Sequence, residues 1–273
     1  MESVRSYYEG RYADDQLQTD LSTRNNRLVF CLDPSLKGNV ILDVGCGPGV
    51  QLAYLVPDNA VYGIDISSVA LAHAHRNGYR TTLANLDGHA LPYVDATFDI
   101  VVCTDLLEHL FSPQDLVQEI RRVLKPDGRA IISVPNHFDF FSRLRLLRGS
   151  GLVLPYHRKC RSWNYYHIRF FTLADFLDLL REEGFAVAQT YYDCGPADEW
   201  AIVLLLTDRE WMRGWTVRHR SRPAFSLAVN IVAACARLAL LPRMLARVLP
   251  GWFPTLFSRH FLVACVKKPS SDT

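Results

Sequence analysis

A glycine-rich turn that follows a short apolar strand is the feature that most limits what this chain can fold into. The apolar, β-branched run Val40–Val44 contains one acid, Asp43, and glycines follow at positions 45, 47 and 49. Such a run is typical of a strand buried in a parallel sheet. Glycines let the backbone turn sharply and approach a ligand closely, and the helix expected next points free N–H groups at the turn. The sequence therefore predicts a binding site here for a ligand that is polar or anionic at one end.

Strand and helix patterns alternate from Val40 onward. The predicted strands are Val40–Val44, Ala60–Asp65, Thr81–Ala84, Phe98–Cys103, Arg129–Val134, Phe185–Tyr191 and Phe261–Val266. The predicted helices are Val50–Val56, Ser68–Asn77, Pro113–Leu124 and Leu173–Glu183, with capping residues at Ser67, Ser112 and Thr172 and a turn at Lys125–Gly128. This alternation predicts an α/β fold built on a doubly wound, mostly parallel sheet.

Two segments interrupt the alternation and define the predicted domain organisation. Residues 1–32 are a helical lead-in or lid, and residues 33–192 are the core, which contains an insertion at 136–167. Residues 193–260 form a basic and apolar helical insertion, and residues 261–273 are the last strand and tail.

Cysteine usage and the first residues bear on the compartment. The seven cysteines are an odd number, are scattered along the chain and form no CxxC pair. This pattern argues against a disulfide framework and a zinc ribbon, and it indicates reduced thiols. Because the chain opens on the polar residues Met1-Glu2-Ser3, no signal peptide is expected and the predicted location is cytoplasmic.

The charge is distributed unevenly. Residues 1–136 carry 17 acidic and 11 basic side chains, whereas residues 137–273 carry 11 acidic and 19 basic ones. A basic second half is compatible with an anionic substrate, with a membrane surface, or simply with solvated arginines. The charge count leaves these alternatives open.

Asp65 makes the ligand of the glycine turn more specific. It lies 20 residues after Gly45, at the end of the second predicted strand. A carboxylate at that place can accept both hydroxyls of a ribose, although an acid at a helix N-terminus also interacts favourably with the helix dipole.

Several further motifs together resemble the class I S-adenosylmethionine-dependent methyltransferases, most of all the group that contains the ubiquinone- and menaquinone-pathway enzymes. The resemblance covers roughly residues 35–192. It rests on Asp43–Gly49, Gly63–Ile66, Asp87–Pro92, Phe98–Leu110 and Lys125–Gly128. It implies a Rossmann-like, mostly parallel seven-stranded sheet whose last strand is antiparallel and is preceded by the helical insertion.

The same resemblance implies S-adenosyl-L-methionine as the cofactor and assigns residues to its parts. Asp43 and Gly45 would face the methionine portion, Asp65 would hold the ribose hydroxyls, and Asp87 would accept from the adenine amino group. The other residues implied at this site are Cys46, Gly47 and Gly49 in the turn, Ile66 against the adenine, Gly88 beside Asp87, and Thr104 to Leu106 at the far wall.

A nicotinamide-dependent oxidoreductase is the competing interpretation of the glycine turn. Such an enzyme favours the spacing G-x-G-x-x-G, whereas the third glycine of this chain comes one residue early. That reading also leaves Asp87 and the segment Asp105–His109 without a function, so the methyltransferase reading is favoured.

Methyl transfer from a sulfonium is an in-line displacement, and a general base is needed only when the acceptor carries a proton. The candidates for such a base are His109, His137 and His167, which stand near predicted strand ends or before the next helix. In some quinone-pathway relatives, the positions that match Asp105-x-x-Glu108-His109 can bind a divalent metal. The favoured interpretation of Glu108 and His109 is a packing pair, and no metal is predicted.

The two insertions bear on the acceptor. Residues 136–167 are rich in basic and aromatic side chains, a composition that also occurs in single-stranded nucleic acid binding. Because no separate RNA-binding module is evident, a small-molecule substrate is expected rather than a nucleic acid. The apolar helix 224–241 and the basic turn after it, together 224–249, are interpreted either as a lid over the sheet or as a peripheral membrane contact.

The sequence thus predicts a methyltransferase that acts on a small molecule, by O-methylation of a bulky apolar or anionic and even lipid-like acceptor. The alternative is a regulatory or partner-binding protein of the same fold that binds the cofactor without turnover. No signal in the sequence identifies the acceptor or the oligomeric state.

Overall fold

The computed structural model describes residues 31–147, 167–193, 254–258 and 260–268, with five single residues nearer the N-terminus, Arg5, Tyr8, Glu9, Tyr12 and Leu28. The predicted apolar helix and basic turn of 224–249 lie outside the described residues, as do most of the insertion 193–260 and part of the insertion 136–167.

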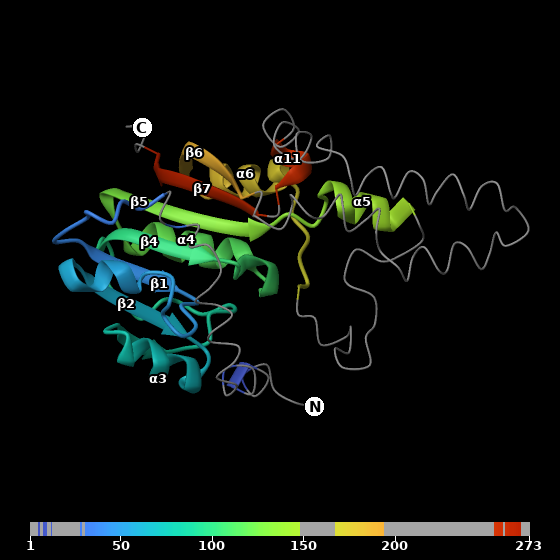
Figure 1. The fold of residues 1–273 in the computed structure, drawn as a ribbon. Helices are drawn as coiled ribbons and strands as arrows, with labels where there is room; N and C mark the ends of the chain where they lie inside the picture. The colour runs from blue at the N-terminus through green and yellow to red at the C-terminus, as the bar shows by residue number, and fades with distance from the viewer. Residues whose placement is uncertain are drawn as a thin grey trace, which may run out of the picture.

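Seven strands form one mixed sheet in the order β3-β2-β1-β4-β5-β7-β6 (Figure 1). The strands are β1 (Val40–Val44), β2 (Ala60–Asp65), β3 (Arg80–Leu83), β4 (Phe98–Thr104), β5 (Leu124–Pro135), β6 (Phe185–Asp193) and β7 (His260–Lys267). The pairs within β1 to β5 are parallel, whereas β7 runs antiparallel to both β5 and β6. The predicted mostly parallel sheet with an antiparallel last strand is confirmed.

The helices begin where the predicted capping residues stand. The described helical elements are η2 (Ala53–Asp58), α3 (Ser68–Arg76), η3 (Leu107–His109), α4 (Pro113–Val123), α5 (Phe140–Leu147), α6 (Leu173–Glu182) and α11 (Pro254–Phe257). The Ser67 hydroxyl accepts from the Ala70 N–H, and Thr172 forms a reciprocal capping box with Asp175. Such caps satisfy N–H groups that have no partner inside the helix. Ser112 makes no capping bond, and α4 starts instead with Pro113 in the first turn.

Two local predictions need correction. The short helix predicted at Val50–Val56 forms instead at Ala53–Asp58, as the 3₁₀ helix η2, which contains Pro57; a proline without an N–H cannot join an α-helical ladder. The predicted turn Lys125–Gly128 lies inside β5. There the register with β4 slips between Phe98 and Ile100, so the extra residues are absorbed in a bulge.

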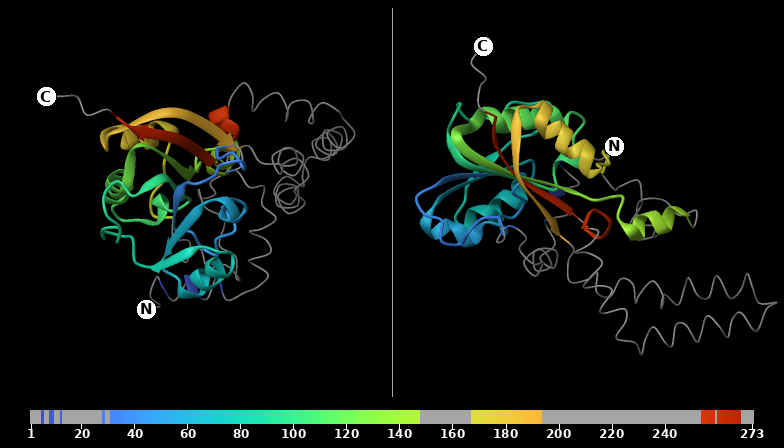
Figure 2. Two further views of the ribbon diagram at one scale, coloured as in Figure 1. Left: turned by 90° about the vertical axis from the view of Figure 1, so that its left-hand side faces the viewer. Right: turned by 90° about the horizontal axis from the view of Figure 1, so that it is seen from above.

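Each face of the sheet carries its own apolar cluster. Alternate residues of β1 point to opposite faces, so Leu42 and Val44 join one cluster and Ile41 joins the other. The first cluster includes residues of α4 and α6, and the second includes residues of α3 and η2. Figure 2 shows α4 and α6 on one side of the sheet and α3 on the other. The sheet is therefore covered on both faces, as a doubly wound fold requires.

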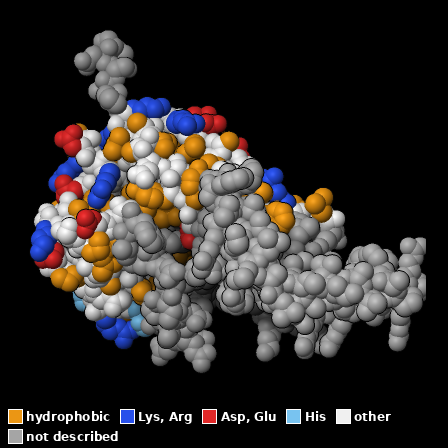
Figure 3. All heavy atoms as spheres, turned by 45° about the horizontal axis from the view of Figure 1, so that its top comes forward, with side chains coloured by type: hydrophobic (Ala, Val, Ile, Leu, Met, Phe, Trp, Pro, Cys, Tyr) orange, Lys and Arg blue, Asp and Glu red, His pale blue; other side chains and the backbone are white. Residues whose placement is uncertain are grey.

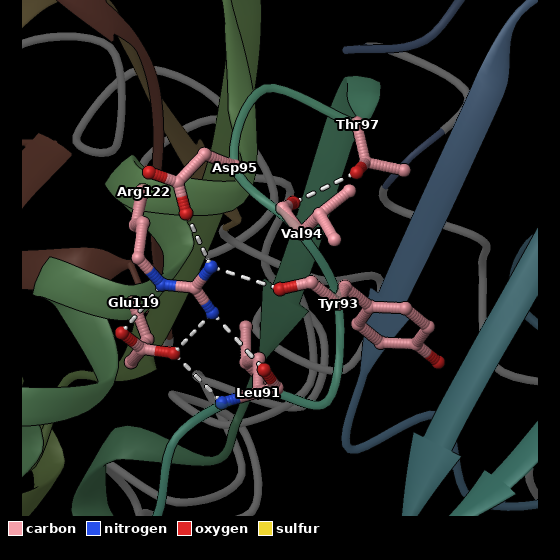
Figure 4. Close-up of polar contacts among 7 residues, drawn as sticks. All are labelled: Leu91, Tyr93, Val94, Asp95, Thr97, Glu119 and Arg122. Atoms are coloured by element: carbon pink, nitrogen blue, oxygen red, sulfur yellow. Dashed lines mark hydrogen bonds and ion pairs between the residues drawn. The ribbon is translucent and has the colours of Figure 1, made fainter.

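An arginine fixes the loop between β3 and β4 (Figure 4). The Arg122 guanidinium donates to Tyr93 O at 2.8 Å and Leu91 O at 3.0 Å, and it pairs with Asp95 at 2.7 Å. Glu119 binds the same guanidinium at 2.7 Å and also accepts from the Leu91 N–H at 2.7 Å. These contacts raise the pKa of Arg122 and lower that of Glu119. The loop that follows Asp87 is thus tied to α4.

The described surface is mixed in charge. On the face shown in Figure 3, acidic side chains alternate with lysines and arginines, and apolar side chains lie between them. Within the part of the chain that is described, no helix combines the length and apolar character needed to cross a membrane. Cys31, Cys46, Cys103 and Cys265 are buried free thiols.

Candidate functional site

The glycine turn lies at the edge of the sheet where the parallel strands end. Gly45 has φ +73°, and a Cβ there would stand 3.1 Å from Leu106 Cδ2. Gly47 has φ +51°, and a Cβ there would stand 3.1 Å from the Tyr12 hydroxyl. An L side chain at either position would meet both backbone strain and a close neighbour. The turn is therefore packed between the segment after β4 and a residue of the N-terminal segment.

Asp65 binds the turn and the start of α3 with the same carboxylate. One oxygen accepts from the Gly47 N–H and the other from the Ser67 N–H, each at 2.9 Å. Burial raises the pKa of Asp65, and these backbone hydrogen bonds oppose that rise. A carboxylate offers about four acceptor positions. Part of that capacity therefore remains beyond the bonds from the backbone.

Asp43 lies beneath the turn rather than on its surface. Its side chain is 3% exposed and accepts a hydrogen bond from the Tyr79 hydroxyl at 3.3 Å. Burial raises the pKa of this carboxyl to about 7. Cys46 is also buried, and burial raises the pKa of its thiol well above the usual range. An amine or ammonium group at the turn would favour the ionised form of Asp43.

Asp87 lies beyond the end of β3, next to the segment after β4. Its Oδ1 accepts from the Phe111 N–H at 3.0 Å. Gly88 beside it is exposed, has φ +71°, and has open space where a Cβ would stand. Ile66, half-buried, follows Asp65 at the end of β2. The residues implied for ribose and adenine thus lie at or just beyond the ends of two neighbouring strands, β2 and β3.

The segment Thr104–Leu106 leaves β4 through a strained residue. Asp105 has φ +52°, which is uncommon for a residue with a side chain. Thr104 donates from its hydroxyl to Gln51 at 3.3 Å, and Leu106 covers Gly45. Backbone strain of this kind persists where the surroundings hold it, and it concentrates at functional sites.

The three candidate histidines meet at this edge. The His137 Nε2 and His167 Nδ1 atoms are 2.8 Å apart, and the rings of His109 and His167 are edge to face with centroids 4.6 Å apart. Glu108, with a side chain 1% exposed, lies between two of them. Its Oε1 is 3.8 Å from the Nε2 of His109 and 3.8 Å from the Nε2 of His167.

Two of these rings are held neutral. Burial, together with the neighbouring histidines, lowers the pKa of His137 to about 4 and the pKa of His167 to about 3. At neutral pH both rings therefore carry a lone pair on one nitrogen.

Sequence reasoning missed His260, Tyr79 and the N-terminal tyrosines. His260 pairs in register with Pro135 of β5 and Asp193 of β6, and its ring lies 3.4 Å from Asp193 and 3.9 Å from Asp105. Since it starts the antiparallel strand, it reaches the edge where the parallel strands end. Tyr8 contacts the His109 ring edge-on, with centroids 6.2 Å apart. A tyrosine-rich N-terminus was the available signal for Tyr8 and Tyr12; no local pattern marks His260 or Tyr79.

Comparisons with known proteins find similar sequences and similar folds. The sequence model of the family described as "Methyltransferase domain" matches residues 42–132. A protein of Mycolicibacterium smegmatis named "Probable S-adenosylmethionine-dependent methyltransferase" is 32% identical over 155 residues, which cover 56% of this chain and 54% of the relative. The ubiquinone biosynthesis O-methyltransferase of Neisseria meningitidis is 27% identical over 164 residues, which cover 57% of this chain and 67% of the relative.

Among solved structures, the complex between the Haloferax volcanii Trm112 methyltransferase activator and a methyltransferase contains a similar chain. It has a TM-score of 0.59 at 15% identity and covers 99% of this chain and 100% of that one; this likeness shows the fold alone. The match spans about half the length of the Mycolicibacterium relative. The predictions of the Rossmann-like methyltransferase fold and of S-adenosylmethionine as the cofactor are confirmed at the level of this domain.

Proposed function

We propose that this protein is a class I S-adenosylmethionine-dependent methyltransferase that transfers the methyl group to an oxygen of a small molecule; residues 42–132 match the methyltransferase-domain model in support. The observation that carries this proposal is the group of imidazoles at the edge where β4 and β5 end. A hydroxyl acceptor must lose its proton during transfer, and an imidazole nitrogen close to a carboxylate is one kind of group that can receive it.

The cofactor is assigned to the opposite part of the same edge. Asp65 receives the ribose hydroxyls, Asp87 the adenine amino group, and the turn Gly45–Gly49 the methionine portion. In support, the Asp65 carboxylate keeps acceptor capacity beyond its backbone bonds, and Leu106, which precedes His109 in the segment after β4, lies against Gly45.

Methyl transfer itself asks little of the protein beyond position. The carbon–sulfur bond breaks as the carbon–oxygen bond forms, so S-adenosylhomocysteine leaves and the hydroxyl proton passes to a base. Holding the two reactants in line, away from water, supplies most of the acceleration. His109, His137 and His167 are the candidates for the base.

The acceptor is proposed to be bulky and apolar or anionic. The insertions 136–167 and 193–260 supply this argument through composition, since they are rich in arginines and aromatic or apolar side chains. A cationic surface beside apolar side chains suits an acceptor with an acidic group or a lipid-like tail.

Two measurements test the proposal. Calorimetry with S-adenosylmethionine and S-adenosylhomocysteine should show binding to the folded protein, and absence of binding by both would refute it. Turnover is then followed with radiolabelled methyl donor on matched acceptors, namely alkyl-substituted phenols and catechols and the corresponding anilines.

Transfer to the hydroxyl compounds and not to the amines supports O-methylation, whereas transfer only to the amines refutes it. Tight cofactor binding without turnover on any acceptor, together with a co-purifying protein, would favour the regulatory or partner-binding alternative.

A further inference from the structure

The backbone of Phe111 joins two side chains that are far apart in the sequence. Its N–H donates to Oδ1 of Asp87 at 3.0 Å, and its carbonyl accepts from the Arg169 guanidinium at 2.5 Å. Asp87 stands 24 residues before Phe111, and Arg169 stands 58 residues after it. Phe111 therefore connects the loop after β3 with the segment 167–171, which precedes α6.

The segment 167–171 is itself fixed against η3. The N–H groups of Ile168 and Arg169 both donate to the Glu108 carbonyl, at 2.9 and 3.1 Å. Glu108 is buried, and Phe171 at the other end of the segment is buried in the apolar cluster that includes residues of α4 and α6. Because its backbone is anchored on both sides, Arg169 presents its guanidinium to the Phe111 carbonyl from a fixed position.

Phe111 depends on such backbone bonds for its own position. Its side chain is 69% exposed, so packing restrains it little. A hydrogen bond from an ionised donor is about twice as strong as one between neutral groups. Loss of the guanidinium should therefore loosen Phe111, and with it the N–H that Asp87 receives.

That N–H determines which way the Asp87 carboxylate faces. The main chain of Asp87 is held locally, since its N–H donates to Asn85 Oδ1 at 3.1 Å and its carbonyl lies 2.8 Å from His89 Nδ1. Within the described residues, its Oδ2 has no hydrogen bond or ion pair. With Oδ1 held by Phe111, Oδ2 is the oxygen that is left to accept from a ligand N–H.

We propose that Arg169 is a positioning residue for adenine recognition, which acts through the Phe111 backbone to aim the Asp87 carboxylate at the adenine amino group. This role rests on the proposed function, because that is where Asp87 is assigned to the adenine. Arg169 does not touch the cofactor in this scheme. Since the segment 167–171 also contains His167, one short segment holds both the adenine acceptor and part of the histidine group.

A purely structural role for Arg169 makes a different prediction. If Arg169 only stabilised the fold around the cofactor, its loss would weaken the contacts to adenine and ribose alike. The positioning role confines the loss to the amino group, because Asp65 is held by the N–H groups of Gly47 and Ser67 and not by Phe111.

The test compares three nucleosides as competitors of radiolabelled S-adenosylhomocysteine on the full-length protein. They are adenosine, purine riboside, which has hydrogen in place of the amino group, and 2′,3′-dideoxyadenosine. Wild type should prefer adenosine to purine riboside by about 10-fold, as expected for one hydrogen bond to a charged acceptor. Asp87→Ala should abolish this amino-group preference.

Arg169→Met should reduce the amino-group preference by about threefold or more, since methionine cannot donate to the Phe111 carbonyl. Arg169→Lys keeps a cationic donor and should retain more of the preference. Arg181→Met makes the same change at an exposed arginine of α6 and should have no effect. In Arg169→Met, the preference for adenosine over 2′,3′-dideoxyadenosine should stay as in wild type.

Thermal unfolding of each variant is compared with wild type first. Where Arg169→Met does not fold, Arg169→Ser, whose side chain is too short to reach the carbonyl, takes its place. A folded variant that keeps the wild-type amino-group preference, or that loses both preferences equally, would overturn the inference. Wild-type protein that binds S-adenosylhomocysteine without any amino-group preference would overturn it too, and would leave the proposed function standing. Failure of wild type to bind S-adenosylhomocysteine at all would instead refute the proposed function, and the role of Arg169 with it.

Discussion

Replacing Asp65 by asparagine tests the assignment of the cofactor site most directly. The substitution keeps the shape of the side chain but leaves one acceptor oxygen in place of two. The Gly47 and Ser67 N–H groups now bind separate oxygens at 2.9 Å, so one of them would face the amide NH₂. A buried donor that loses its acceptor costs about 1–3 kcal/mol, and the variant should be less stable by about that amount.

The effect on cofactor binding should exceed the effect of a surface mutation. Asparagine loses the charge-assisted hydrogen bonds to the ribose hydroxyls, each worth about 1.5–3 kcal/mol when the acceptor is charged. Loss of one such bond corresponds to about 10–150-fold weaker binding of S-adenosylhomocysteine. Calorimetry on folded protein measures this, with Asp127→Asn, an exposed acid of β5, as the matched control.

A ribose-specific comparison separates direct contact from distortion of the turn. Wild-type protein should bind adenosine more tightly than 2′,3′-dideoxyadenosine, and Asp65→Asn should reduce that preference. If the variant folds, binds S-adenosylhomocysteine within twofold of wild type and keeps the preference, the assignment of Asp65 to the ribose is wrong.

Three further outcomes are expected. Gly49→Ala should destabilise the protein by about 2 kcal/mol or more, since φ is +69° and the new Cβ would stand 2.9 Å from Ala74 Cβ. Gly38→Ala is the control for backbone strain alone, because Gly38 has φ +73° and open space where a Cβ would stand. Equal losses of stability for the two variants in denaturant unfolding would contradict the packing argument. Burial raises the pKa of Asp43 to about 7 in the folded protein, so the fold favours the protonated carboxyl. The stability that this carboxyl contributes is complete below its pKa in the unfolded chain, and it is lost as the pH rises from about 4 to about 7. That loss is at most about 4 kcal/mol. Asp43→Asn should flatten the dependence of the free energy of unfolding on pH, measured without cofactor. An unchanged dependence would show that another group titrates. Arg122→Lys should lower stability by about 2 kcal/mol, because lysine lacks the planar guanidinium that makes several hydrogen bonds at once. The substitution should also speed hydrogen exchange of the Leu91 amide, whose N–H is held by Glu119. Exchange as slow as in wild type would show that the loop does not depend on Arg122.

The sequence by itself determined the strands around the glycine turn. The bounds of β1 and β2 were predicted to the residue, because apolar runs that end at an acid and glycines are local signals. Asp65 could be placed beside the glycine turn since adjacent parallel strands bring their carboxyl ends to one edge. The caps at Ser67 and Thr172 were also readable, as a helix start depends on a few neighbouring residues.

The tertiary structure decided which side chains meet around the histidines. The insertion of β7 between β5 and β6 sets His260 opposite Pro135 and Asp193. The backbone bonds of Ile168 and Arg169 set His167 against Glu108. The sequence analysis interpreted Glu108 and His109 as a packing pair, and it could not place His167 beside them because His167 lies far along the chain. Strand order and long-range hydrogen bonds depend on which segments meet after folding, and no periodicity within one segment records that.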